Sequence, residues 1–162
     1  MNETTTANGI NGNGAAASAG SKQFVLQNLY VKDMSFESPG APQIFQGGNI
    51  EPETELNIRN GHAELSDGLY EVKLHISVHA KQGDQTIFLV ELEQAGVFQI
   101  GGYAIDETKT LLSTHCPATL FPYARETISS LVSKGGFPPL LLQPISFDAL
   151  YARAREQQNT QA

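Results

Sequence analysis

Residues 85–102 show the clearest alternation of apolar and polar positions in the chain, and this pattern predicts a β-strand. Side chains of a strand point alternately to its two faces. One face then carries Phe88, Val90 and Leu92 and, beyond Gln94 and Gly96, also Phe98 and Ile100. The other face carries Leu89, Glu91 and Glu93. The first face suits a hydrophobic core, whereas the second is typical of a docking surface because it combines carboxylates with an apolar residue.

Three further segments alternate in the same way and predict strands over residues 24–38, 53–59 and 69–79. In the first of them, alternation places one set of side chains together: Phe24, Leu26, Tyr30, Met34 and Phe36. The opposite set is Val25, Leu29, Val31, Asp33, Ser35 and Glu37. Both faces are apolar in the first half of this strand, which predicts that it is central in the sheet or paired with another subunit.

The connections between these strands predict the topology of the sheet. Gly61 and Asp67-Gly68 mark one short turn and residues 82–84 mark another, so the last three strands form a meander. Residues 38–52 contain three prolines and three glycines and predict a long irregular loop. This loop returns the first strand across the meander, which predicts a Greek-key arrangement.

The second half of the chain predicts helices, so the expected fold class is α+β. Residues 106–114 begin with two acids, which suit a helix N-terminus. A longer helix begins at Pro117 and ends at Gly135-Gly136, and Pro122 is expected to kink or divide it. Ser146 is suited to cap a last helix with one narrow apolar stripe.

Length and composition favour one domain over residues 22–158, flanked by a disordered tail at 1–21 and a disordered end at 159–162. The chain has a single Cys and therefore no Cys pair, which excludes a disulfide framework. No apolar run approaches the length of a membrane span, so we expect a cytoplasmic protein. The strand at 24–38 and the helix at 117–134 carry more apolar positions than one sheet face requires, which predicts an oligomer of four chains.

Negative charge is concentrated in the first half of the chain. Residues 33–93 hold eleven acidic residues against three basic ones, whereas the net charge of the whole chain is −7. Such a field repels nucleic acid and anionic lipid and favours a basic partner.

The sequence contains no set of residues that predicts metal binding or nucleophilic catalysis. His75 and His79 share a strand face, but four residues of strand separate them by roughly 13 Å, which is too far to share a metal. Adjacent residues such as His115 and Cys116 diverge at a helix boundary, so they do not predict a nucleophile with its base. We therefore expect no catalytic residue, no metal and no cofactor.

Four blocks of sequence are distinctive in composition and order: LYVKDMSFE at residues 29–37, FLVELEQAGVF at 88–98, CPATLFPYARETISSLVSKGGFPPL at 116–140 and PISFDALY at 144–151. Together they resemble the SecB family of bacterial export chaperones. The resemblance extends over nearly all of residues 23–158. It implies a four-stranded antiparallel sheet with helices packed on one face, assembled as a dimer of dimers.

The resemblance also implies a function and its residues. The family holds unfolded precursor proteins without ATP and delivers them to the SecA motor. SecA, including its basic zinc-carrying C-terminal segment, is expected to bind Asp33, Glu37, Leu89 and Glu91. The zinc belongs to SecA. Clients are expected to bind an apolar groove formed by Ile44, Phe45, Ile50, Phe137, Leu140 and Leu142.

The residues expected to bind SecA and those expected to bind clients each have a simpler interpretation. Outward carboxylates such as Glu91 and Glu93 are commonly only a solvated face, and apolar loop residues such as Phe45 and Ile50 commonly pack under their own loop. Two other functions fit the composition, namely a carrier of an apolar small molecule and a purely structural oligomer. Suppression of aggregation without nucleotide distinguishes the chaperone from both.

Overall fold

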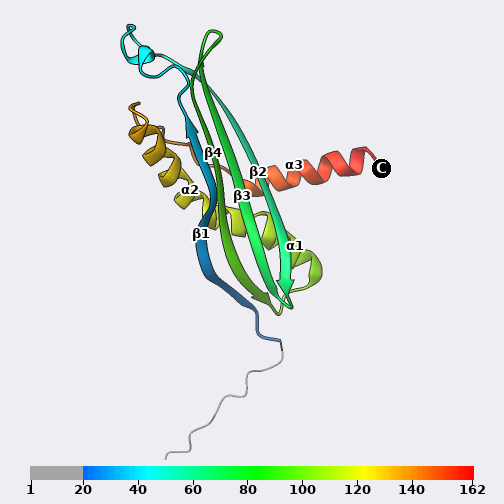
Figure 1. Cartoon of the computed structure of the whole chain (residues 1–162). Helices are drawn as coiled ribbons and strands as arrows, with labels where there is room; N and C mark the ends of the chain where they lie inside the picture. Colours follow the sequence, from blue (N-terminus) through cyan, green and yellow to red (C-terminus); the bar gives the residue numbers. More distant parts are fainter. Residues whose placement is uncertain (1–19) are drawn as a thin grey trace, which may run out of the picture.

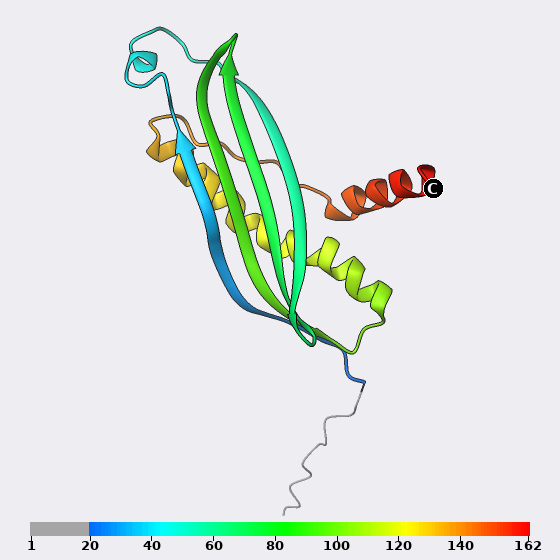
Figure 2. The ribbon, with the colours of Figure 1, turned by 45° about the vertical axis from the view of Figure 1, so that its right-hand side comes forward.

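The computed structural model describes residues 20–162 as one antiparallel sheet whose helices lie on one side (Figures 1 and 2). The strands are β1 (Gln23–Glu37), β2 (Glu53–Ser66), β3 (Leu69–Gln82) and β4 (Gln85–Gly101). The helices are α1 (Ile105–Ser113), α2 (His115–Lys134) and α3 (Phe147–Thr160). The α+β class with a four-stranded antiparallel sheet is confirmed. The predicted disordered tail lies outside the described residues, except for residues 20 and 21.

The strand order β1-β4-β3-β2 follows from one long and two short connections. Gly68 and Gly83 adopt positive φ angles of 71° and 59° in the tight turns that join β2 to β3 and β3 to β4. The loop over residues 38–52 crosses the end of the sheet and sets β1 beside β4. Gly61 was expected to mark a turn, but it pairs with Lys73 inside the ladder and β2 continues to Ser66.

The core lies between the inner face of the sheet and α2. Val72, Leu74 and Ile76 of β3 are fully buried there. The apolar residues of α2 that meet them are also buried: Cys116, Leu120, Phe121, Ala124, Ile128 and Val132. Most of the apolar positions on this helix are therefore absorbed by the chain's own core, and Tyr123 is its one large apolar side chain that is exposed. α2 runs through Pro122 without a break, so of the two expected effects of this proline, division of the helix is wrong and a kink stays a prediction.

Two bulges in β1 change which of its side chains face the core. Relative to β4, β1 carries one extra residue between Leu26 and Asn28 and another between Val31 and Asp33. Each extra residue reverses the alternation. Leu29 thus opposes Gly96 on the inner side, and Tyr30 opposes Ala95 on the outer side. The faces expected for Leu29, Tyr30 and Val31 were wrong because simple alternation does not reveal bulges.

α3 projects away from the sheet in both ribbon views. Ser146 caps it as expected, since its hydroxyl oxygen accepts a hydrogen bond from the Ala149 N–H at 3.2 Å. Only Phe147 of this helix is buried. The helix extends two residues beyond the predicted domain end at residue 158.

Candidate functional site

Four outward residues of β1 and β4 form a patch on the uncovered face of the sheet, which we call the acidic patch: Asp33, Glu37, Leu89 and Glu91. Glu37 lies directly opposite Leu89, while Ser35 and Asp33 lie opposite Glu91 and Glu93. Directly opposed residues of antiparallel strands point to the same side of the sheet. The structure therefore brings together all four residues that the sequence predicted for SecA binding.

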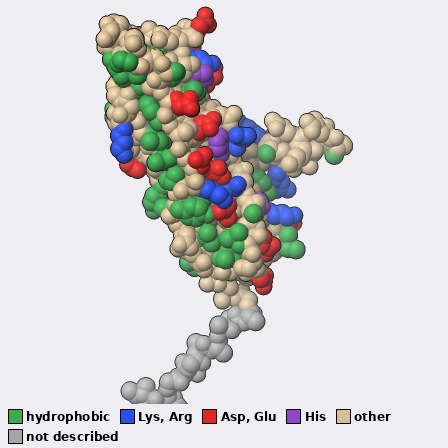
Figure 3. Space-filling view, viewed as in Figure 1, with side chains coloured by type: hydrophobic (Ala, Val, Ile, Leu, Met, Phe, Trp, Pro, Cys, Tyr) green, Lys and Arg blue, Asp and Glu red, His purple; other side chains and the backbone are tan. Residues whose placement is uncertain are grey.

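The acidic patch is not neutralised by the chain's own bases. Among the described residues, Asp33, Glu37 and Glu91 take part in no ion pair. Glu93 differs, because Lys73 Nζ lies 3.2 Å from its Oε1. Figure 3 shows acidic side chains in a column over the sheet, interleaved with basic and His side chains. Three uncompensated carboxylates around the half-buried Leu89 suit a basic partner that also carries an apolar contact.

The patch continues into a shallow hollow toward β2 and β3. This hollow has a volume of about 420 Å³, and Ser77, His79 and Glu55 line it together with Leu89 and Glu91. Its walls are already engaged within the chain, because His79 Nε2 lies 2.9 Å from the Thr86 hydroxyl and Lys81 pairs with Glu55. Sequence analysis missed the hollow because it depends on the pairing of β2 with β3.

Glu71 lies on the same outer face but is satisfied within the chain. The Tyr30 hydroxyl donates to Glu71 Oε2 at 2.5 Å, and Lys32 Nζ lies 2.8 Å from Oε1. Hydrogen bonds from Lys32 and Tyr30 hold the pKa of the Glu71 carboxyl below its ordinary value. Burial and the hydrogen bond to Glu71 raise the pKa of Tyr30 to about 12. Glu71 thus links β1 to β3 across β4 and contributes little free charge to the face.

The residues expected to bind clients divide into buried and accessible ones. Ile44, Phe137 and Leu142 are 8%, 7% and 5% exposed, so they belong to the core. Ile50 and Leu140 are half-buried. Phe45 is 49% exposed, and its ring centroid lies 5.4 Å from that of Phe137. Ile44 therefore anchors the crossover loop over residues 38–52 to the core, while most other residues of the loop are exposed.

Other accessible apolar surface was missed by the sequence analysis. Leu141 is 66% exposed in the extended segment before α3. A second groove of about 480 Å³ runs between β2 and α3, with Ile58, Phe147 and Leu150 in its lining. The narrow apolar stripe of α3 was the sequence feature that could have indicated this groove. It did not predict the direction in which α3 leaves the core, and the groove depends on that direction.

Nucleophilic and metal chemistry find no support in residues 20–162. Burial raises the pKa of the Cys116 thiol to about 12, so this residue holds no reactive thiolate. The neighbouring His115 ring packs edge-on against Phe24 with centroids 5.0 Å apart. In the same range, no three His, Cys, Asp or Glu side chains gather as a metal site would require. None of the described helices has the length and apolar character needed to cross a membrane.

Comparison with known proteins decides the family. The model of the family described as Preprotein translocase subunit SecB matches residues 17–158. The chain belongs to the SecB family. A Protein-export protein SecB from Nitrosococcus oceani is 49% identical over 139 residues, which are 85% of each chain. Another from Methylococcus capsulatus is 48% identical over 141 residues, which cover 87% of this chain and 90% of the relative.

The SecB assignment confirms the predicted role as a chaperone of protein export. A solved SecB-like chaperone of Mycobacterium tuberculosis, in complex with a ChAD peptide from an antitoxin, has a similar fold with a TM-score of 0.63. That similarity covers 76% of this chain and 91% of the other at 19% sequence identity, so it supports the SecB fold alone.

Proposed function

We propose that this SecB-family chain is a cytoplasmic, non-enzymatic holdase that binds unfolded precursors without ATP and delivers them to SecA. The observation that carries the proposal is the acidic patch, in which the residues implied by the family resemblance lie together on the uncovered sheet face. Its carboxylates are uncompensated among the described residues. The partner fitted by this patch is the basic zinc-carrying segment of SecA, which supplies its own metal.

Charge and apolar contact have different parts in this docking. Rim carboxylates accelerate encounter with a basic segment, and they are screened over a Debye length of about 8 Å at physiological salt. Leu89 lies opposite Glu37 and two residues before Glu91 on β4, and it offers a contact from which water can be excluded. Binding to SecA should therefore weaken as salt rises without being abolished.

Clients are proposed to bind the helical side and the crossover loop. Phe45 and Leu141 are exposed, so a client can contact them in the closed chain. Ile50 and Leu140 are half-buried and offer only part of their apolar surface. Ile44, Phe137 and Leu142 become available to a client only if the loop lifts, because they lie in the core of the closed chain. Docking of SecA and binding of clients then occupy different faces.

The proposed assembly is a homotetramer, built as a dimer of dimers. β1 has a strand neighbour on one side only, although it is 15 residues long. Val25, Val31 and Met34 of this strand are 44%, 41% and 52% exposed. A long apolar edge strand is prone to pair with another chain, so β1 is the first candidate for contact between subunits.

The test of the proposed function is charge reversal within the acidic patch. Glu91→Lys should weaken binding to SecA by roughly tenfold or more in titration calorimetry at low salt. It should leave suppression of aggregation of an unfolded protein, measured by light scattering without nucleotide, unchanged.

Asp84→Lys is the matched control. Asp84 is exposed in the turn between β3 and β4, outside the patch, and forms no ion pair with another described residue. Glu71→Lys is unsuitable as a control because it breaks the contacts with Tyr30 and Lys32. Normal SecA binding by Glu91→Lys, or equal loss in Asp84→Lys, would refute the site. Absence of aggregation suppression in the unaltered protein would refute the holdase.

A further inference from the structure

The bulge at Lys32 decides which face of the sheet Asp33 and Glu37 join. Before this bulge, the ladder sets Leu29 opposite Gly96 on the covered side of the sheet. Strict alternation from Leu29 would turn Asp33 and Glu37 toward that same side. Lys32 is the extra residue of the bulge, and it reverses the alternation. The two carboxylates therefore point to the open face because the bulge is present.

Gln94 of β4 contacts this bulge from the covered side of the sheet. It is 3% exposed and lies opposite the fully buried Leu74 of β3. Its side-chain Nε2 donates a hydrogen bond to the Tyr30 carbonyl oxygen at 2.9 Å. A bulge interrupts the ladder of a strand, so a backbone carbonyl shielded from water there needs another donor. Gln94 supplies such a donor next to the bulge.

The rest of the Gln94 amide gains nothing from its buried position. Among the described residues, its Oε1 atom has no hydrogen-bond partner, although this atom is buried. An unpaired polar atom in a core destabilises the fold. Leu92 and Phe98, on the same face of β4, are apolar and buried. Packing alone would favour an apolar residue at position 94, so the bond to the bulge is what a glutamine adds there.

The same bulge is also held from the open face. Tyr30 and Lys32 both bond to Glu71 of β3, which lies across β4 from them. These two hydrogen bonds hold the pKa of the Glu71 carboxyl below its ordinary value, so it stays ionised near neutral pH. Gln94 and Glu71 thus contact the bulge from opposite faces of the sheet.

We propose that Gln94 is a positioning residue for SecA docking, because it holds the bulge that places Asp33 and Glu37 on the open face. The inference rests on the proposed function and adds to it a residue that does not touch the partner. Without the bond from Gln94, β1 exchanges between this register and one that lacks the bulge. In the second register Asp33 and Glu37 turn toward the covered side, and fewer chains present the whole acidic patch.

Gln94→Met tests the proposal in the full-length protein, because methionine has a similar volume but cannot donate to the Tyr30 carbonyl. This variant should weaken SecA binding about fivefold in titration calorimetry at low salt, while aggregation suppression without nucleotide stays unchanged. Tyr30→Phe releases the bulge from the open side without altering the core. It should weaken SecA binding about twofold.

A double-mutant cycle separates positioning from a general loss of stability. In a chain that carries Asp33→Asn and Glu37→Gln, addition of Gln94→Met should weaken SecA binding by less than about 1.5-fold. The reason is that the two side chains through which Gln94 acts no longer carry charge. A residue that only stabilised the sheet would cause the same loss in this background as in the unaltered chain.

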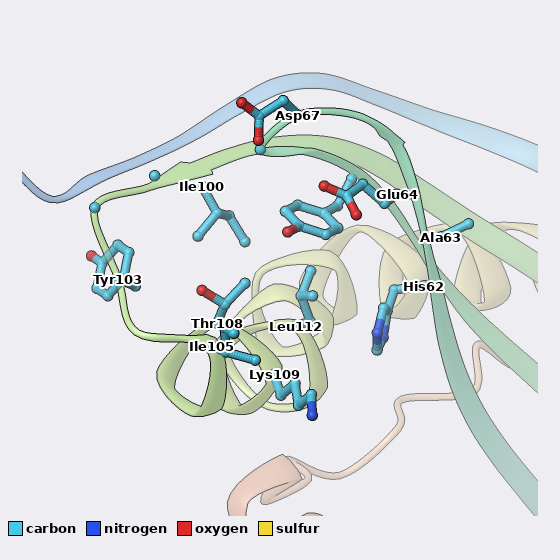
Figure 4. A pocket seen from close by; sticks show the side chains of 14 residues that line it. His62, Ala63, Glu64, Asp67, Ile100, Tyr103, Ile105, Thr108, Lys109 and Leu112 are labelled. Atoms are coloured by element: carbon cyan, nitrogen blue, oxygen red, sulfur yellow. The ribbon is translucent and has the colours of Figure 1, made fainter.

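The control background removes two carboxylates elsewhere on the sheet. Glu64 and Asp67 border a hollow of about 520 Å³ over Ile100, between the end of the β2–β3 hairpin and α1 (Figure 4). This hollow is at the opposite end of the sheet from the crossover loop (Figure 1), and no residue of the acidic patch lines it. With Glu64→Gln and Asp67→Asn in place, Gln94→Met should still weaken SecA binding about fivefold.

Each remaining outcome supports or overturns the positioning role. Equal loss in the two backgrounds would overturn it, as would normal SecA binding by Gln94→Met while Glu91→Lys binds poorly; the proposed function would survive both results. Failure of the unaltered protein to bind SecA would count against the proposed function itself. If Gln94→Met alters the assembly mass in light scattering, the same cycle run with Tyr30→Phe decides the question.

Discussion

Gly135 allows β1 and the end of α2 to approach each other closely. A Cβ atom at this position would collide with the ring of Phe36. That ring cannot move aside without cost, because it packs on Phe88 with centroids 6.0 Å apart and on Phe137 at 6.5 Å. The glycine was visible in the sequence only as a helix stop, yet its main role is contact between two elements.

Gly135→Ala should therefore lower the free energy of unfolding by about 1–3 kcal/mol, the usual cost of overpacking. Urea denaturation followed by circular dichroism measures the difference. Gly47→Ala is the control, because nothing lies within 4 Å of a Cβ added there. If both variants were as stable as the unaltered protein, the rings of Phe36, Phe88 and Phe137 would be able to rearrange at little cost.

Glu71 makes stability depend on pH. Its carboxyl has a folded pKa below the ordinary 4.5, owing first to the hydrogen bond from Lys32 and then to that from Tyr30. A lowered folded pKa means that the folded state favours the ionised form. The stabilisation is therefore complete above the unfolded pKa and is lost as pH falls through the folded pKa.

Glu71→Gln should lower the free energy of unfolding by about 1 kcal/mol at pH 7, since Lys32 is partly exposed and the ion pair is partly screened. The gap between the variant and the unaltered protein should close as pH falls below 4.5. Thermal unfolding at several pH values and constant protein concentration measures it. A gap that stays constant across this range would exclude ionisation of Glu71 as its cause.

At the scale of elements, the crossover loop combines a buried anchor with an exposed aromatic residue. Ile44 and Phe137 lie in the core, while Phe45 stands half in solvent above Phe137. The loop is thus held closed by its own apolar residues, and the same residues are those predicted to contact clients. Anchoring and binding can be separated by substitution because the two kinds of residue differ in burial.

Phe45→Ala should reduce client binding several-fold and leave the free energy of unfolding within about 1 kcal/mol of the unaltered protein. Phe137→Ala should instead cost about 3–5 kcal/mol, because it empties a buried site. Aggregation suppression and urea denaturation measure the two effects. If Phe45→Ala lost stability but kept client binding, Phe45 would serve only to hold the loop closed and would not contact clients.

At the scale of the whole molecule, the sheet has one covered face and one open face, with an exposed apolar edge at β1. The open face carries the acidic patch, and the helical side carries the apolar hollows and the crossover loop. Under the proposed function, a client and a basic partner would occupy different faces of the molecule. β1 lies at an edge of the sheet and has a neighbouring strand on one side only.

Light scattering should give the mass of four chains at micromolar concentration. Met34→Asp should shift the assembly toward smaller species, because it places a charge on the apolar edge of β1. Leu65→Asp is the control, since Leu65 is 55% exposed at the far end of β2. A monomer in the unaltered protein, or identical masses for both variants, would contradict the proposed role of β1.

The sequence by itself determined the fold class, most of the elements, the family resemblance and the outward positions of the acidic patch. Strand alternation identified β3 and β4 because both faces of these central strands follow a strict period of two. The same period placed Leu89 and Glu91 outward, and alternation in the first strand did so for Asp33 and Glu37; the motif resemblance then assigned these four residues to SecA binding. These inferences depend on local patterns, and local patterns are contained in the sequence.

Only the tertiary structure decided what depends on contacts between distant segments. The bulges of β1 turned Tyr30 outward to meet Glu71, 41 residues away, and packing of the crossover loop buried Ile44 and Phe137. The hollow above Ile100 likewise needs the hairpin end and α1 to meet. Register shifts, burial and cavities arise from how elements pack, and a pattern read along one segment at a time does not contain that information.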